Sequence, residues 1–236
     1  MAGTHFYVDG LNLYYGALRG TPHKWLDLRL LARALLPYDE LGLVRYFTAN
    51  VKPQFPGDRA HERQNAYLRA LAACPEVVVV KAHFRNDVRR RALAVDESGG
   101  NPFLPPLRPG DVLRDMLDDG MARSENGAVL ASVRTPEEKG SDVSLGAHLV
   151  RDALTGRCDK AIVVTNDSDL TEPIRMAVEE GVPVGVANPH RGATSRRLLQ
   201  VASFEVPFRH RVVADCQLPT PVVTGTGRQV HKPREW

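Results

Sequence analysis

The chain has 236 residues, of which 43% are hydrophobic and 25% are charged, and its formal net charge is +3 at pH 7. This composition is typical of a folded globular protein with one large core, and it excludes a disordered or low-complexity chain. The small excess of positive charge permits a nucleic-acid partner without requiring one.

Neither a membrane segment nor a cysteine-based site is indicated. No apolar run approaches the ~18 residues that a membrane span needs, and the first apolar run already contains Asp9, so no export signal is indicated. We therefore expect a cytoplasmic protein without membrane contact. The cysteines have neither zinc-site nor disulfide spacing and are expected to be buried, reduced thiols: Cys74, Cys158 and Cys216.

Short apolar or β-branched runs alternate with helix-like segments along most of the chain. This alternation is typical of βαβ units and therefore of an α/β fold with a mainly parallel sheet. The runs expected to form strands are residues 5–8, 41–48, 77–80, 161–164 and 182–187. The segments expected to form helices are residues 25–36, 58–73, 143–154 and 172–180. The last strand is expected at a sheet edge, because Pro183 cannot donate a ladder hydrogen bond.

Residues 85–128 interrupt this alternation. They contain many turn-forming Pro and Gly residues and are too short to build a core of their own, so we expect an insertion at the sheet edge. Residues 112–121 are expected to form a short helix, and residues 129–133 a strand paired with residues 89–95. A basic cluster in this segment is either a solvated surface or a phosphate-contacting one, and its members are Arg85, Arg89, Arg90 and Arg91.

The C-terminal segment, residues 206–236, differs in composition from the rest of the chain. It is rich in Pro, Thr and Gly and has little helical periodicity. We expect an irregular tail that packs on the preceding domain through Val222, Val223 and Trp236.

The apolar run of residues 161–164 has no polar alternation, which indicates a strand buried on both faces in the middle of the sheet. Asp167 and Asp169 follow it closely. In an open parallel sheet, ligands bind beyond the carboxyl ends of the strands. These two carboxylates are therefore expected to lie where an α/β protein keeps its functional site.

Two further acids are expected at the same rim of the sheet. Asp9 follows the first strand directly, and Asn12 opens the next turn or helix. Asp142 lies at the start of a later helix, three residues after Lys139. Helix capping is an alternative interpretation for Asp9 and Asp142, because Asp often caps helices. Capping does not explain why a second strand end, the one before Asp167, also carries acids.

Such a group of acids predicts a metal site. Carboxylates within a few ångströms of one another repel, and one takes up a proton unless a cation lies among them. Oxygen ligands without His or Cys suit a hard ion, so we expect Mg²⁺ or Mn²⁺, as one ion or two. Such an ion can activate water and stabilise the charge on a phosphate. The chain has no Gly-rich phosphate loop and no Ser/His/Asp or Cys/His signature that would indicate other chemistry.

Three motifs, in this order, resemble those of NYN domains, which are PIN-like nucleases, and specifically the LabA-like bacterial branch. The motifs are Asp9-Gly10-Leu11-Asn12, Lys139-Gly140-Ser141-Asp142 and Thr165-Asn166-Asp167-Ser168-Asp169. The resemblance extends to residue 205, so residues 1–205 are expected to form one domain. It implies a three-layer α/β sandwich of PIN-like or Rossmannoid type and metal-dependent hydrolysis of RNA phosphodiester bonds.

The resemblance also implies roles for individual residues. The acidic metal-site positions are matched by Asp9, Asp142, Asp167 and Asp169. Asn12 matches the amide that orients the site, and Lys139 matches a lysine that could contact a phosphate. The implied partner is RNA, single-stranded or structured, and a homodimer is compatible with the sequence. The cations expected to guide the RNA are Arg85, Arg89, Arg90, Arg91, Arg191 and Arg196.

Two positions depart from the family pattern. Many NYN domains carry a further Asp six residues after the position of Asp142, where this chain has His148. We expect His148 to be a half-buried helix residue, and the missing acid reduces the expected catalytic competence if it binds metal in relatives. Asn166 stands where Gly is usual, and Asn tolerates a left-handed turn.

Two other functions compete with the nuclease. A haloacid-dehalogenase-type phosphatase needs a second Asp two positions after the one that follows its first strand, and this position is Leu11. The stronger alternative is a catalytically weak or inactive RNA-binding or regulatory protein with the same fold. Metal-dependent cleavage of RNA distinguishes it from the nuclease.

Overall fold

The computed structural model describes residues 3–53, 55–92, 122–123 and 129–236. The chain divides into two compact units. The first unit consists of Met1–Phe84 and Glu138–Trp236, and the second is Arg85–Glu137. The second unit thus begins where the sequence interrupts its alternation, and it ends at Glu137 rather than at residue 128.

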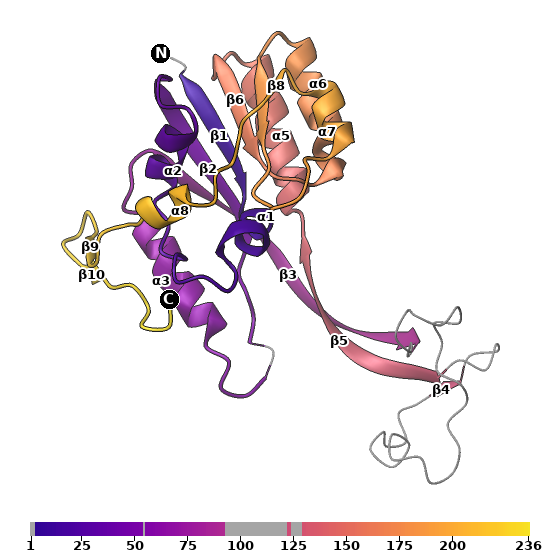
Figure 1. Ribbon diagram of the computed structural model, residues 1–236. Coiled ribbons are helices and arrows are strands. Elements are labelled where there is room, and N and C mark those ends of the chain that lie inside the picture. Colours follow the sequence, from indigo (N-terminus) through magenta and orange to yellow (C-terminus); the bar gives the residue numbers. More distant parts are fainter. Residues whose placement is uncertain (1–2, 54, 93–121, 124–128) are drawn as a thin grey trace. The chain divides into compact units, whose positions relative to one another are not determined.

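A mainly parallel sheet forms the centre of the first unit (Figure 1). Its strands, in spatial order, are β3 (Val77–Ala92), β2 (Leu41–Ala49), β1 (Thr4–Asp9), β6 (Lys160–Val164), β7 (Val184–Ala187) and β8 (Phe204–Glu205). Each neighbouring pair is parallel. The strands β1, β6 and β7 are buried almost along their whole length, which explains their continuous hydrophobicity.

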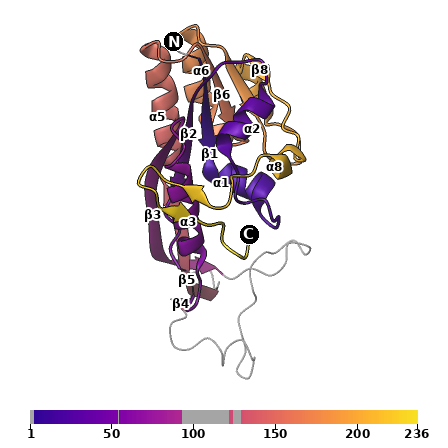
Figure 2. The same ribbon diagram turned by 90° about the vertical axis from the view of Figure 1, so that its left-hand side faces the viewer.

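Helices cover both faces of this sheet, so the unit is a three-layer α/β sandwich (Figure 2). One face is covered by α1 (Gly10–Leu13), the π-helical turn η1 (Tyr14–Leu18), α2 (Leu28–Leu35), α3 (Ala60–Leu71) and α8 (Val212–Asp215). The other face is covered by α5 (Ser141–Leu154), the 3₁₀ turn η3 (Ser168–Leu170), α6 (Thr171–Glu179) and α7 (Arg196–Val201). Alternate residues of β1 face the two cores, Phe6 and Val8 the first and Tyr7 the second. The predicted fold class is confirmed.

The position of β7 shows that the expectation of an edge strand was wrong. β7 lies between β6 and β8, and the edge strand on this side is the short β8. Pro183 precedes the first strand residue, Val184, so its missing N–H removes no ladder bond. Its carbonyl instead accepts a hydrogen bond from the Ala161 amide at 3.0 Å. A proline directly before a strand therefore does not identify an edge.

The strand β5 (Val129–Lys139), all of which up to Glu137 belongs to the second unit, neighbours β3 and pairs with β4 (Ala122–Arg123) in antiparallel orientation. The strand expected over residues 129–133 is part of this longer strand, and β3 also extends well beyond its expected end. The short helix expected over residues 112–121 lies outside the described residues.

The C-terminal segment has more regular structure than the sequence indicates. It contains α8 and a small antiparallel sheet formed by β9 (Val222–Val223) and β10 (Gln229–Val230). Val222 is buried in the first core and Trp236 packs against that core, but Val223 is exposed, contrary to expectation.

The cysteines are buried free thiols, as expected: Cys74, Cys158 and Cys216. Their burial raises the pKa of each thiol, which makes the reactive thiolate scarce near neutral pH. Within the described ranges of the chain, none of the helices is long and apolar enough to cross a bilayer.

A buried ion pair joins α5 to the sheet. Arg45 on β2 contacts Asp152 on α5 at 2.9 Å, and their side chains are 7% and 0% exposed. The Tyr7 hydroxyl donates a hydrogen bond to the same carboxylate at 2.9 Å. His5 lies 3.2 Å from Arg45, and its pKa is lowered by burial and by the Arg45 charge. Because these groups are shielded from water, each depends on its partners, and together they attach α5 to β1 and β2.

Loss of one partner of this ion pair should be costly. We expect Asp152→Ala to lower the free energy of unfolding by about 3–5 kcal/mol, because it leaves Arg45 buried without its counter-charge. Urea unfolding followed by circular dichroism measures this difference. Glu180→Gln, which changes an exposed acid just after α6, is the control and should alter stability by less than about 0.5 kcal/mol. Equal stability of Asp152→Ala and the wild type would show that the ion pair does not hold α5.

Candidate functional site

Asp9 ends β1 and is only 4% exposed. Its Oδ1 accepts a hydrogen bond from the Asn12 amide at 2.9 Å, which caps α1, and its Oδ2 accepts one from Thr165 Oγ1 at 3.0 Å. Burial raises the pKa of Asp9 and the nearby charge of Asp167 adds to the rise, whereas the hydrogen bonds from Asn12 and Thr165 oppose it. Asp9 is therefore both a helix cap and a carboxylate held against the end of β6.

Thr165 connects Asp9 with Asp167. Because β1 and β6 pair in parallel, the residues that follow the two strands are neighbours. Thr165 is fully buried, and its Oγ1 donates to Asp9 and accepts a hydrogen bond from the Asp167 amide at 3.1 Å. Asp167 Oδ1 accepts a hydrogen bond from the Asp169 amide at 3.0 Å, which caps η3. Both acids were predicted at this rim. Thr165 belongs to the third motif of the sequence, but no role was predicted for it, because a threonine after a strand carries no distinctive signal.

Asp142 lies in the first turn of α5, which packs against β1 and η3. The N-cap residue is Gly140, whose φ of 94° strongly favours glycine, so Asp142 does not cap this helix. Partial burial raises the pKa of Asp142 to about 6, with contributions from the charges of Asp9, Asp167 and Asp169. In the structure, the charges of the other three predicted acids therefore act on Asp142.

Asn12 is held by two loops. Its Oδ1 accepts a hydrogen bond from the Asn166 amide at 2.9 Å and lies 3.0 Å from His190 Nε2. Asn188 Oδ1 accepts a hydrogen bond from the His190 amide at 2.8 Å, and Asn166 Oδ1 accepts one from the Ser195 amide at 2.7 Å. Among the described residues only glycines have a positive φ, so Asn166 does not form a left-handed turn.

His190 is a site residue that sequence analysis missed. It lies half-buried in the loop after β7, and it lines a cavity of about 400 Å³ together with Arg191, Glu205 and Phe208. In the sequence His190 stands far from Asn12, and only the strand order brings their loops together. No local pattern around His190 could have indicated this contact.

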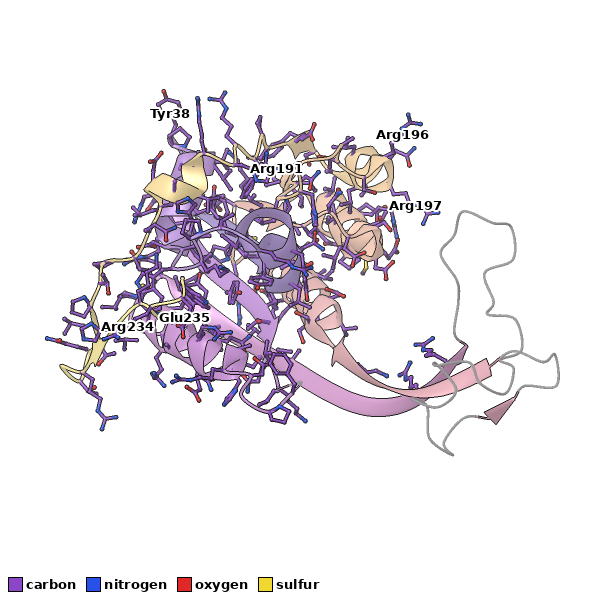
Figure 3. The ribbon with its side chains drawn as sticks, turned by 60° about the horizontal axis from the view of Figure 1, so that its bottom comes forward. Tyr38, Arg191, Arg196, Arg197, Arg234 and Glu235 are labelled. Atoms are coloured by element: carbon purple, nitrogen blue, oxygen red, sulfur yellow. The ribbon has the colours of Figure 1, made fainter. Side chains whose placement is uncertain are left out.

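The predicted nucleic-acid contacts of the first unit are exposed cations. Arg191 is exposed beside His190, and Arg196 extends outward from α7 (Figure 3). The neighbouring Arg197, which was not among the predicted contacts, also extends outward. Lys139 is exposed at the end of β5, immediately before the N-cap of α5.

The other predicted contacts belong to the second unit and are Arg85, Arg89, Arg90 and Arg91. Arg89 is half-exposed and Arg91 is exposed. The side chains of Arg85 and Arg90 lie outside the described residues, and the RNA-binding role of all six arginines stays a prediction.

His148, which replaces an acid of the family pattern, is a half-buried packing residue, as expected. Its ring meets the Phe47 ring edge-on, with centroids 5.6 Å apart, and its Nδ1 lies 2.9 Å from Arg151 Nη2. Burial and the charge of Arg151 lower its pKa. These contacts favour the neutral form of His148, which supplies no negative charge to the acidic rim.

The carboxylates of Asp9, Asp142, Asp167 and Asp169 are the type of ligand that a hard divalent cation binds. Carboxylate oxygens are the ligands that Mg²⁺ prefers. Burial is the main cause of the raised pKa of Asp142, and the charges of the other rim acids add a repulsion that a cation would relieve. In the part of the chain that the structure describes, no three His, Cys, Asp or Glu side chains form a ready metal-binding group. Because Mg²⁺ keeps several waters and commonly uses one or two carboxylates, the residues present fit an ion held largely through water.

Comparison with known proteins finds distant relatives. No family model matches the chain. The chain is 28% identical, over 254 residues, to 6-hydroxy-3-succinoylpyridine 3-monooxygenase HspA of Pseudomonas putida (strain DSM 28022 / S16), covering 99% of this chain and 75% of that protein. This relative is named as an enzyme. A solved structure of a protein of unknown function from Vibrio parahaemolyticus RIMD 2210633 is 16% identical with a TM-score of 0.42, covering 91% of this chain and 95% of the other. Neither likeness assigns the chain to a family.

The raised pKa of Asp142 couples stability to pH. A carboxyl group whose pKa rises on folding, here from 3.8 to about 6, destabilises the fold when it is ionised. The penalty is therefore absent below about pH 4 and complete above about pH 6. We expect Asp142→Asn to raise the melting temperature at about pH 7.5, with a gain that shrinks as the pH falls and vanishes near about pH 4. Thermal unfolding in EDTA across this pH range measures the gain.

The control for this experiment is Glu180→Gln, which should show no comparable gain at any pH. A stabilisation by Asp142→Asn that persists undiminished at about pH 4 would contradict an electrostatic origin.

Proposed function

We propose that this protein is a metal-dependent ribonuclease that hydrolyses RNA phosphodiester bonds at its acidic rim, which consists of Asp9, Asp142, Asp167 and Asp169. The observation that supports it most directly is the pair of hydrogen bonds through Thr165 that connects Asp9 with Asp167 at the ends of β1 and β6. The charges of Asp9, Asp167 and Asp169 also act on Asp142, where they add to the effect of burial in raising its pKa to about 6. Such mutual repulsion is a cost that Mg²⁺ or Mn²⁺ would offset. The rim also lies between β1 and β6, where the strand order reverses, and α/β sheets commonly bind ligands at such a point.

The residues at and around the rim would have different roles in this reaction. The four acids would hold the ion, directly or through water, and the ion would stabilise charge on a reacting phosphate and favour ionisation of water. Thr165 orients the carboxylate of Asp9, and Asn12 ties the start of α1 to the loop after β6. Lys139 and Arg191 are exposed cations of the same unit and would bind phosphate groups of the RNA strand.

The main alternative on the same fold is a catalytically weak or inactive RNA-binding or regulatory protein. His148, at a position where many NYN domains carry an acid, favours this alternative. The acids would then serve the fold through caps such as that of Asp9 on the Asn12 amide. RNA binding without metal-dependent cleavage would support it.

A second candidate function is oxygenation of a pyridine compound. It is favoured by the name of the relative, 6-hydroxy-3-succinoylpyridine 3-monooxygenase, and by a similarity that extends over 99% of this chain. A monooxygenase consumes dioxygen and a reductant, for which a reduced nicotinamide is a common source. Dioxygen uptake by the purified protein with 6-hydroxy-3-succinoylpyridine and NADH would support this candidate. Mn²⁺-dependent RNA cleavage without such uptake would support the nuclease.

Removal of one rim charge tests the nuclease. We expect the wild type to cleave single-stranded RNA in Mn²⁺ or Mg²⁺, and Asp167→Asn to cleave it at least about 100-fold more slowly, because a neutral amide binds the ion less well. The rates are measured with fluorescently labelled RNA, and EDTA supplies the blank. Without metal, Asp167→Asn should melt at the same temperature as the wild type or higher, because repulsion at the rim is relieved.

Asp159→Asn, which changes an exposed acid outside the rim, is the control for Asp167→Asn and should cleave like the wild type. If Asp167→Asn and the wild type cleave equally, the activity comes from a contaminating nuclease and the proposal fails. Collapse of the fold in Asp167→Asn would support the capping role of this residue instead.

RNA binding should depend steeply on salt. Each phosphate that a cation neutralises contributes about 0.7 to the slope of log K against log salt for a single strand. We expect the double variant Arg191→Gln and Arg196→Gln to reduce this slope by about 1.4. Fluorescence anisotropy measures it in EDTA at several salt concentrations, with Arg69→Gln, an exposed position on α3, as the control. An unchanged slope would exclude these two arginines from the RNA-binding surface.

A further inference from the structure

A cavity of about 690 Å³ lies in the first unit, and none of the four rim acids lines it. Its walls come from the α1–η1 segment, the end of β2, helix α3 and the C-terminal residues of the chain. In Figures 1 and 2 the C-terminal end lies beside α3. The volume is within the ~300–1,000 Å³ that is typical of small-molecule sites.

Aromatic side chains form most of one wall of this cavity. Tyr46 and Tyr67 are 7% and 4% exposed and meet edge to face, with ring centroids 6.1 Å apart. Trp236 meets Tyr67 at 6.0 Å with an angle of 67° between the rings. Tyr14 and Tyr15 form another edge-to-face pair at 5.3 Å, and Tyr15 is 56% exposed, so this pair reaches the solvent. Such a wall favours a flat ring, which gains area burial and ring–ring contacts together.

Two cations line the same cavity, Lys24 from the loop after η1 and Arg63 from α3. Lys24 Nζ donates a hydrogen bond to the Thr21 carbonyl at 2.7 Å, a neutral partner that does not compensate its charge. Burial lowers the pKa of Lys24, and the charges of Arg63 and Lys232 lower it further. An anion between Lys24 and Arg63 would relieve this repulsion. Among the described side chains that line the cavity, two are cationic, Lys24 and Arg63, and one is acidic, Glu235.

The cavity adjoins the acidic rim through Gly10, which follows Asp9 directly and also lines the cavity. A Cβ atom at Gly10 would lie 2.8 Å from Cζ of the Tyr46 ring and 2.5 Å from the Phe47 carbonyl oxygen. The chain therefore requires glycine here, and the Tyr46 ring packs directly on the first turn of α1. A ligand in the cavity would lie next to this turn.

We infer that the cavity binds a small molecule in which a flat aromatic ring carries an anionic group. The ring would lie against Tyr46, Tyr67 and Trp236, and the anionic group would bind Lys24 and Arg63. Two sources offer this chemistry, a nucleotide and a free aromatic carboxylate. Binding does not depend on the proposed hydrolysis, because the metal-site acids lie outside the cavity lining.

Tryptophan fluorescence of the full chain can report such binding. The chain has two tryptophans, Trp236 in the wall and Trp25, whose ring centroid is 6.4 Å from that of Trp236. The probes are AMP and UMP as nucleotides, benzoate and nicotinate as free carboxylates, ribose 5-phosphate as an anion without an aromatic ring, and nicotinamide as a neutral ring. We expect saturable quenching by a nucleotide or a carboxylate probe, and at least about tenfold weaker binding of ribose 5-phosphate and nicotinamide. Isothermal titration calorimetry confirms the affinities.

Charge removal tests the position of the anionic group. Arg63→Gln should weaken binding of the best probe by about tenfold, whereas Arg69→Gln, exposed on the same helix outside the cavity, should leave it unchanged. Binding of nucleotides alone would identify a nucleotide site, and binding of carboxylates alone a metabolite site; both outcomes support the inference. Absence of saturable binding by every probe, or equal affinity of Arg63→Gln and Arg69→Gln, would overturn it.

The same variants separate this inference from the proposed nuclease. Asp167→Asn should lose RNA cleavage and keep probe binding, because Asp167 does not line the cavity. Loss of probe binding in Arg63→Gln with a wild-type melting temperature would establish the cavity even if no RNA is cleaved.

Discussion

The parallel pairing of β1 with β6 is the constraint on which the candidate site depends. It sets the ends of two strands side by side although Asp9 and Thr165 are 156 residues apart in the chain. The hydrogen bond from Thr165 to Asp9 and the one from the Asp167 amide to Thr165 then connect the two ends. Because the strand order reverses between β1 and β6, the segments that follow these two strands run to opposite faces of the sheet. In α/β folds, ligands commonly bind at the crevice that this reversal leaves.

A second set of interactions brings α5 to that junction. The ion pair of Arg45 with Asp152 attaches the helix to the sheet and is buried, so it tolerates little displacement. At the other end of the same helix, Asp142 enters the field of the rim acids, and its pKa rises to about 6. One end of α5 is therefore stabilised by the ion pair of Asp152, whereas at the other end the negative charges of the rim acids repel that of Asp142. Strongly shifted pKa values are frequent at functional sites, and at Asp142 burial is the largest cause, with the charges of the rim acids adding to it.

The acidic rim and the aromatic cavity meet at the turn that follows β1. Gly10 lies between them, with Asp9 on one side and the Tyr46 ring on the other. An acidic rim suits a divalent ion and a phosphate, whereas an aromatic wall with nearby cations suits an anionic ring. The rim and the cavity therefore favour different ligands. A nucleotide, which carries both a phosphate and an aromatic base, is the ligand class whose parts could occupy both.

The sequence by itself determined the local features: the positions of the expected strands and helices to within a few residues, except for β3 and β5, which are longer than expected, and the acids that follow two apolar runs. These features are readable because the periodicity of side chains and the polarity of the following turn are encoded within a few residues. Tertiary structure alone decided that β7 is an internal strand, that Thr165 and His190 join the acids, and that Trp236 completes a cavity with Tyr46 and Tyr67. The physical reason is that these contacts join residues far apart in the chain, whose meeting is set by the energy of packing the sheet as a whole and leaves no periodic pattern in the sequence.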